Sequence, residues 1–122
     1  MKYNELIIRT KGYSLNVVRF VRTLKIPRDE YFLKNQIMRS ATSIACNYRA
    51  VCRAQTNKAF ISKMSIVIEE TDETLFWMEV IQEIYPGHDQ PESILLIKEG
   101  NELLKIFVSS RLTMLRKMNH TK

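Results

Sequence analysis

Apolar residues recur along most of this chain at the spacing of an α-helix. The clearest stripe lies within residues 29–54, at steps of four, four, three, four and three: Leu33, Ile37, Ala41, Ile44, Tyr48 and Val51. Such steps place side chains on one face of a helix, whereas a half-buried strand requires alternation in twos. No segment of the sequence shows that alternation. We therefore expect an all-α protein.

Three further segments carry similar stripes, and proline and glycine separate them. The stripe within residues 4–25 is Leu6, Tyr13, Val17, Phe20 and Leu24, and that within residues 57–85 is Phe60, Met64, Val67, Thr71, Leu75 and Met78. Pro27 and the Tyr85-Pro86-Gly87 run end helices, while Asp29, Thr56 and either Asp89 or Gln90 are expected to cap the helices that follow. We predict helices over about residues 4–25, 29–54, 57–85 and 91–118, in one domain spanning residues 1–122. Short connections between long helices predict an antiparallel up-down four-helix bundle. The predicted buried stripe of the last helix is Ile94, Ile97, Leu104, Val108, Leu112 and Leu115.

Several apolar residues lie outside the predicted core stripes. They are Ile8, Leu15 and Val18 in the first helix, Met38, Ala45 and Cys52 in the second, and Phe76 and Val80 in the third. A helix in a four-helix monomer buries one stripe, and surplus apolar surface is typical of a partner face. We therefore expect a homo-oligomer.

The charge is unevenly distributed along the chain. The net charge is +6, but residues 1–58 carry twelve Lys and Arg against three Asp and Glu, whereas residues 59–99 carry two against nine. Basic surfaces displace counterions from nucleic acid, so we interpret the basic residues of the first two helices as phosphate contacts. The candidates are Arg9, Arg19, Arg22, Lys25, Arg28, Arg49, Arg53 and Lys58. The alternative is a solvated face with inter-helix ion pairs.

An acidic cluster lies in the middle of the third helix, at Glu69, Glu70, Asp72 and Glu73. If helices two and three are antiparallel about a turn near residue 55, Ser40 lies near Glu70 and Arg39 reaches the cluster. We predict a structural polar layer that fixes helix register, formed by Arg39, Ser40, Asn47, Glu70 and Glu73. The Asn47 amide is expected to hydrogen-bond across the helix interface or to a serine.

Catalysis and cofactor binding find no support in the sequence. The only histidines are His88 and His120, so a di-metal carboxylate site is not expected, and no nucleophile–base pair or phosphate-binding loop is present. Cys46 and Cys52 are six residues apart, point to different helix faces, and are interpreted as small buried hydrophobes. No apolar run reaches ~20 residues and no signal peptide is recognised, which predicts a cytoplasmic protein without membrane spans.

Three segments resemble the four-helix bundle family named for 23S rRNA intervening sequences. They are Gln36 to Arg49, Arg53 to Met64, and Glu69 to Trp77. The resemblance implies the bundle fold and a ring-like homo-oligomer, namely a pentamer. A structurally similar bundle, the accessory protein of diversity-generating retroelements, is a basic pentamer that binds nucleic acid and a reverse transcriptase. Many members carry an acidic residue soon after the asparagine, where this chain has Arg49-Ala50.

Two functions follow as hypotheses. The first is a homo-oligomeric bundle that binds RNA or DNA through the basic faces of its first two helices. The second is a scaffold or adaptor whose oligomer docks another protein, with charge serving solubility and helix pairing. An enzyme is the remote third alternative.

Overall fold

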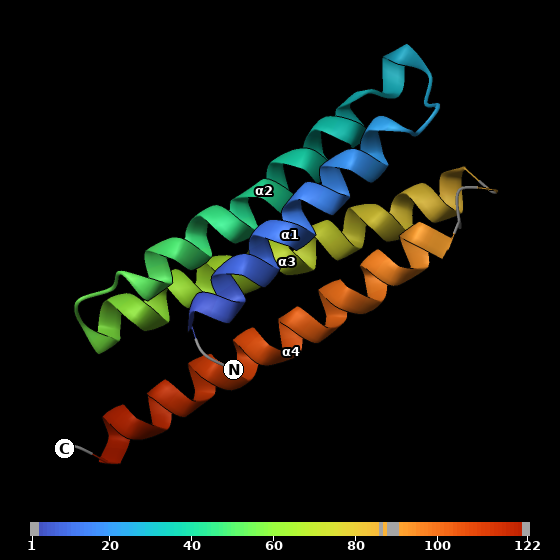
Figure 1. The fold of residues 1–122 in the computed structure, drawn as a ribbon. Helices are drawn as coiled ribbons and strands as arrows, with labels where there is room; N and C mark the ends of the chain where they lie inside the picture. Colours follow the sequence, from blue (N-terminus) through green and yellow to red (C-terminus); the bar gives the residue numbers. More distant parts are fainter. Residues whose placement is uncertain (1–2, 86, 88–90, 121–122) are drawn as a thin grey trace.

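The computed structural model describes residues 3–85, 87 and 91–120. It contains four α-helices, α1 (Tyr3–Arg22), α2 (Phe32–Cys52), α3 (Asn57–Ile84) and α4 (Pro91–His120), and one 3₁₀ turn, η1 (Arg28–Glu30). Consecutive helices run in opposite directions (Figure 1). The prediction of an all-helical bundle is confirmed, since the described residues contain no strand. Contacts join α1 to α2, α2 to α3, α3 to α4 and α4 to α1, so α1 and α3 lie diagonally across the bundle.

The apolar stripes predicted for the first three helices form the core. Val17, Ile37, Ile44 and Val67 are fully buried, and every other member of those three stripes is also buried. Burial of such side chains contributes about 1.5–3 kcal/mol each to folding. These stripes therefore account for why α1, α2 and α3 associate.

The prediction for the buried face of α4 is wrong. Ile94, Val108 and Leu112 are 57 %, 46 % and 44 % exposed. The helix instead turns another stripe inward, at steps of three, four, three and four: Ser93, Leu96, Gly100, Leu103 and Phe107. Two members of this stripe are small, so the hydrophobic pattern of the sequence follows the neighbouring, more apolar face. Small residues are used here because they let α4 approach its neighbours closely.

Helix ends follow their predicted signals only in part. Thr56 caps α3 as predicted, since its Oγ1 accepts a hydrogen bond of 3.0 Å from the Ala59 backbone N–H. Asp29 does not cap α2: it lies inside η1, and α2 begins at Phe32 with no side-chain cap. The first helix ends at Arg22 rather than near residue 25. The predicted cap at Asp89 or Gln90 lies outside the described residues.

Buried hydroxyl groups bring α1 close to α2. Ser14 of α1 donates a hydrogen bond of 2.5 Å to the Ala41 carbonyl of α2. Thr10 of α1 is fully buried and donates to the Ile7 carbonyl of its own helix. These small polar residues satisfy their own hydrogen bonds while leaving little separation between the helices. The approach of α1 to α2 positions the basic surface described next.

Candidate nucleic-acid interface

The two helices of the basic face contain almost no carboxylates. No Asp or Glu occurs in α2, and Glu5 is the one acidic residue in α1. The core stripes point inward, so the remaining positions place Lys and Arg on the outside. The outer surface of this helix pair is therefore positive along its length.

A groove follows the outer junction of α1 and α2. It has a volume of about 940 Å³ and is lined by Ile7, Ile8, Lys11, Ala45, Cys46, Arg49, Ala50, Cys52 and Arg53. We call it the basic groove, because Lys11, Arg49 and Arg53 are exposed around an apolar floor. None of these three cations forms an ion pair within the described part of the chain. They are free to meet an anion from solution.

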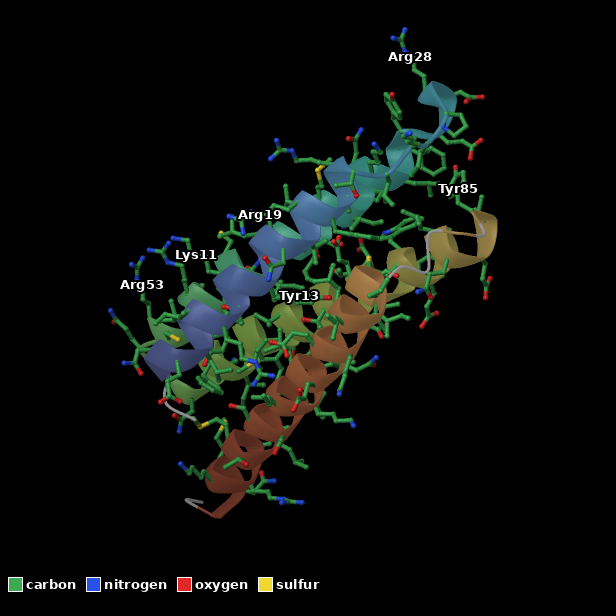
Figure 2. All side chains as sticks on the ribbon, turned by 45° about the vertical axis from the view of Figure 1, so that its right-hand side comes forward. Lys11, Tyr13, Arg19, Arg28, Arg53 and Tyr85 are labelled. Atoms are coloured by element: carbon green, nitrogen blue, oxygen red, sulfur yellow. The ribbon has the colours of Figure 1, made fainter. Side chains whose placement is uncertain are left out.

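The other predicted cations extend this surface toward the α1–α2 turn. Figure 2 shows Arg53, Lys11 and Arg19 projecting from the same side of α1 and α2, with Arg28 further along. Four of the predicted contacts are exposed at positions away from the groove: Arg22, Lys25, Arg28 and Lys58. Arg19 is also exposed and makes one contact of 3.4 Å, to the Asn16 side chain. Seven of the eight predicted contacts are thus accessible.

Arg9 does not belong with these residues. Its guanidinium faces α4, where Nε and Nη2 each donate a hydrogen bond of 2.7 Å to Glu99, and Nη2 lies 3.4 Å from Glu102. The hydrogen bonds to Glu99 raise the pKa of Arg9 above its ordinary value. We exclude Arg9 from the interface because its charge is already matched by two carboxylates.

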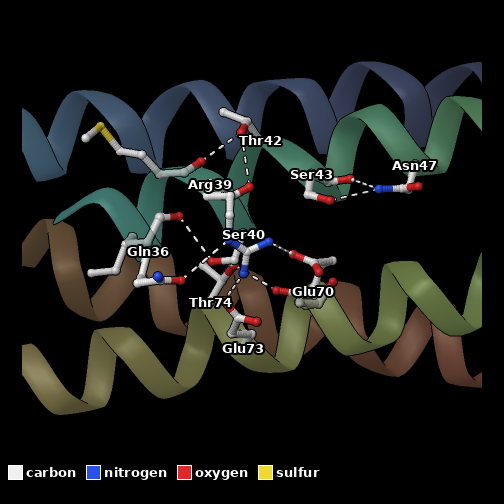
Figure 3. A network of polar contacts seen from close by, with 12 residues as sticks. Gln36, Arg39, Ser40, Thr42, Ser43, Asn47, Glu70, Glu73 and Thr74 are labelled. Carbon is white, nitrogen blue, oxygen red and sulfur yellow. Dashed lines mark hydrogen bonds and ion pairs between the residues drawn. The ribbon is translucent and has the colours of Figure 1, made fainter. Parts of the chain in front are cut away.

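The predicted polar layer brings Arg39 to two glutamates of α3 (Figure 3). Arg39 Nη1 lies 3.3 Å from Glu70 Oε2, and its Nη2 donates to Glu73. The hydrogen bond to Glu73 raises the pKa of Arg39. The Arg39 side chain is 51 % exposed, so the layer is a surface clamp between α2 and α3 rather than a buried charge network. Trp77 adds an Nε1–H donor 3.2 Å from the same Glu73 carboxylate.

Ser40 forms the buried half of this layer, whereas Asn47 lies outside it. Thr74 Oγ1 donates a hydrogen bond of 2.8 Å to Ser40 Oγ, which links α3 to α2 inside the core. The Asn47 amide instead donates to the carbonyl and the hydroxyl of Ser43, at 2.9 and 2.8 Å. Its partner is a serine, but one turn earlier in its own helix rather than across the interface.

Two features of this surface were missed from the sequence. Lys11 lines the basic groove but was not among the predicted contacts; its spacing of four from Leu15 and eight from Arg19 is the signal that places it on the same helix face. Cys46 was expected to be buried and is exposed, because it lies on the outward stripe of α2 that also carries Arg53. Cys52 is half-buried, and burial raises the pKa of its thiol.

Across residues 3–85, 87 and 91–120, no group of three His, Cys, Asp or Glu side chains is arranged to hold a metal ion. His88 lies outside those residues. None of the described helices has the length and apolarity required to cross a bilayer.

Comparison with known proteins fixes the family. The family model described as 23S rRNA-intervening sequence protein matches residues 4–109. The chain belongs to this family. A crystal structure at 1.70 Å of a protein of unknown function from the S23 ribosomal protein family of Bacteroides thetaiotaomicron VPI-5482 is similar to the 23S rRNA-intervening sequence protein fold seen here. The two share 25 % sequence identity with a TM-score of 0.77, over 86 % of this chain and 96 % of that chain. No functionally curated protein matches the chain significantly.

Proposed function

We propose that this protein is a non-enzymatic, cytoplasmic homo-oligomer that binds RNA or DNA through the basic surface of α1 and α2. The observation that supports the proposal best is the set of three exposed cations around the basic groove, Lys11, Arg49 and Arg53, none of which has a carboxylate partner among the described residues. Phosphate groups are the anions that such unpaired cations bind in nucleic acid. The ligand would be held mainly through its backbone.

The composition of this surface argues for binding with little sequence preference. Apart from its three cations, the groove has an aliphatic or thiol lining that offers no amide or carboxylate to read base edges: Ile7, Ile8, Ala45, Cys46, Ala50 and Cys52. Cations around such a lining supply counterion release, the sequence-independent part of affinity. The matched family is named for 23S rRNA intervening sequences, which favours RNA as the first ligand to test.

The homo-oligomeric part of the proposal depends on exposed apolar residues. Ile8 is 72 % exposed, Phe76 53 % and Leu15 42 %. Ile8 and Leu15 lie seven residues apart on one face of α1, and Phe76 is on α3. Exposed apolar side chains of this size are typical of a contact surface. The family resemblance implies a pentamer, and assembly would repeat the basic groove in each copy and raise the affinity for a long nucleic acid.

A gel-shift titration with a 30-nucleotide RNA and a DNA duplex of equal length tests nucleic-acid binding. We expect affinity to fall steeply as salt rises, and R49E/R53E to abolish most binding at salt where the unaltered protein binds. The matched control is K98E/K105E, which makes the same charge change on exposed positions of α4 and should have a smaller effect. No binding of either probe at low salt would disprove the proposal.

The adaptor hypothesis is supported by the same exposed apolar residues, which fit a protein partner as well as a second copy. It predicts that the R49E/R53E variant still captures the partner that the unaltered protein captures, with no nucleic acid present. Nuclease treatment before affinity purification distinguishes the two functions, because a partner bridged by RNA is lost and a directly bound protein is retained.

A further inference from the structure

We infer that the outer stripe of α3 binds the outer stripe of α1 on a second copy of the chain. This inference rests on the homo-oligomeric part of the proposed function and assigns its contact surfaces. The α3 acidic stripe consists of Glu69, Asp72, Phe76, Glu79 and Glu83, all exposed. None of its four carboxylates has an ion pair in the described residues, whereas the neighbouring Glu70 and Glu73 are held by Arg39.

An apolar anchor lies in the middle of the acidic stripe. Phe76 is 53 % exposed, and its ring packs edge-on against Trp77 at a centroid distance of 5.1 Å. Trp77 is itself fixed by its hydrogen bond to Glu73. Because Trp77 is held in place, the Phe76 ring that packs against it is also held in position while it remains exposed to solvent. An exposed aromatic ring surrounded by carboxylates fits a partner with an apolar centre and cations on both sides.

The outer surface of α1 has that composition. The α1 basic stripe consists of Ile8, Lys11, Leu15, Arg19 and Arg22, all exposed, with Ile8 at 72 % and Leu15 at 42 %. Its cations carry no ion pair in the described part of the chain. Leu15 corresponds to Phe76 as the central apolar residue of the stripe.

The two stripes also match in length and step. Steps of three and four lead from Glu69 through Asp72 to Phe76, and the same steps lead from Ile8 through Lys11 to Leu15. The end residues of both stripes are fourteen positions apart in sequence, at 69 and 83 and at 8 and 22, which is about 21 Å of helix. When Leu15 is placed beside Phe76 with the helices parallel, Lys11 meets Asp72 and Arg22 meets Glu83. Arg19 then lies beside Glu79.

The α1 basic stripe and the α3 acidic stripe cannot contact each other within one chain. Contacts join α1 only to α2 and α4 among the helices, and α3 lies diagonally opposite. Each copy therefore offers one stripe of each sign on opposite sides of the bundle. Such an interface is head-to-tail, so assembly continues until it closes into a ring or extends as a filament. It uses Lys11, Arg19 and Arg22, so that Arg49, Arg53 and Lys58 remain for nucleic acid in the assembled protein.

Charge exchange tests this interface by light scattering. R19E/R22E and E79R/E83R should each reduce the solution mass of the folded protein to that of one chain, because each places like charges opposite one another. The chain carrying all four substitutions should regain the mass of the unaltered assembly. An equal mixture of the two double variants should also assemble, in alternation and therefore with an even number of chains.

The control and the contrary outcomes separate this inference from the proposed function. R49E/R53E makes the same charge change as R19E/R22E outside the stripes and should keep the unaltered mass. If the unaltered protein is monomeric, or if R19E/R22E remains assembled, the inference is wrong. The same holds if the fourfold variant is folded by circular dichroism yet monomeric. Gel shifts with R49E/R53E address nucleic-acid binding independently of these masses.

Discussion

The phenolic oxygen of Tyr13 in α1 lies against Gly100 of α4, where a Cβ atom would come within 2.6 Å of it. The same Cβ would lie 2.8 Å from Leu75 Cδ2 of α3. Glycine inside a helix is less stable than alanine by roughly 0.5–1 kcal/mol. Its presence in the middle of α4 is explained by this three-helix contact. The position of α4 on the bundle therefore depends on a missing side chain.

We predict that G100A destabilises the protein by about 1–3 kcal/mol, since the added methyl group must displace two buried side chains. Urea unfolding gives the free energy. G12A is the matched control: Gly12 lies within α1 with nothing within 4 Å of its Cβ position, so alanine should stabilise by about 0.5–1 kcal/mol. If both alanines are stabilising, the contact at Gly100 is not the constraint described.

Alkaline pH should unfold the protein in part through Tyr13. Burial raises the pKa of this phenol above 10, and no described group hydrogen-bonds to its hydroxyl. A raised pKa in the folded state means that the folded protein retains a proton that the unfolded chain releases. Stability is therefore unaffected below pH 10 and falls as pH rises above it. We expect Y13F to show a weaker fall in denaturant midpoint above pH 10 than the unaltered protein.

Tyr85 provides the comparison for that pH dependence. Burial and its hydrogen bond to Glu30 raise the pKa of Tyr85 to about 12. Y85F should remove only the dependence between pH 10 and about 12. A denaturant midpoint for Y13F that declines as steeply as that of the unaltered protein would contradict the assigned role of Tyr13.

The buried hydroxyl pair of Ser40 and Thr74 should show measurable coupling. Thr74 Oγ1 lies 2.8 Å from Ser40 Oγ, and both residues are fully buried. We predict that S40A and T74A each destabilise by about 1–2 kcal/mol, and that the double variant loses less than their sum by about 1 kcal/mol. T42A, at an exposed position on α2, should change stability by less than about 0.5 kcal/mol. Strict additivity would show that the hydroxyls act independently.

Arg9 and Arg53 should differ in how they affect nucleic-acid binding. R53Q removes an unpaired cation of the basic groove and should lower the slope of log affinity against log salt by about 1 for duplex DNA. R9Q should leave that slope unchanged, because Glu99 and Glu102 already pair with Arg9. Its expected effect is a loss of stability of up to about 1 kcal/mol. Equal slope changes for both variants would show that Arg9 also contacts nucleic acid.

The two apolar faces of α4 predict opposite mutational sensitivities. Leu103 is fully buried, so L103A should destabilise by about 2–5 kcal/mol. I94A removes a side chain that is 57 % exposed and should change the stability of one chain by less than about 1 kcal/mol. Thermal unfolding of the two variants at equal concentration compares them directly. A large loss with I94A alone would support the stripe that the sequence predicted.

Periodicity predicts the fold well where large residues make the core. The stripes containing Tyr13, Ile44 and Val67 could be identified because large apolar residues recur in them at helical spacing, and all of these residues are buried. The α4 stripe could not, since Ser93 and Gly100 occupy buried positions and apolar residues occupy exposed ones. The reason for a buried glycine lies in Tyr13 and Leu75, which are distant in sequence.

The same distinction applies to the candidate site. Contacts between helices that follow one another could be predicted, whereas contacts between segments far apart in sequence could not. Antiparallel pairing of two neighbouring helices is enough to place Arg39 near Glu70 and Glu73. Arg9 differs because Glu99, with which it hydrogen-bonds, lies ninety residues away in α4, and the sign of a charge does not say which helix it faces. For Asn47 the sequence predicts a hydrogen bond across the interface or to a serine, and the partner is a serine of its own helix, Ser43, one turn away. Basic residues can therefore be counted from the sequence. Which carboxylates they pair with depends on how the helices pack against one another.

The hydrogen bond from Trp77 to Glu73 gives this protein a built-in optical reporter. Trp77 is the one tryptophan of the chain, and its indole shares a carboxylate with Arg39 of the neighbouring helix. It also contacts Phe76 on the α3 acidic stripe. Intrinsic fluorescence therefore monitors a single locus where helix pairing and the outer face of α3 meet, without any attached dye.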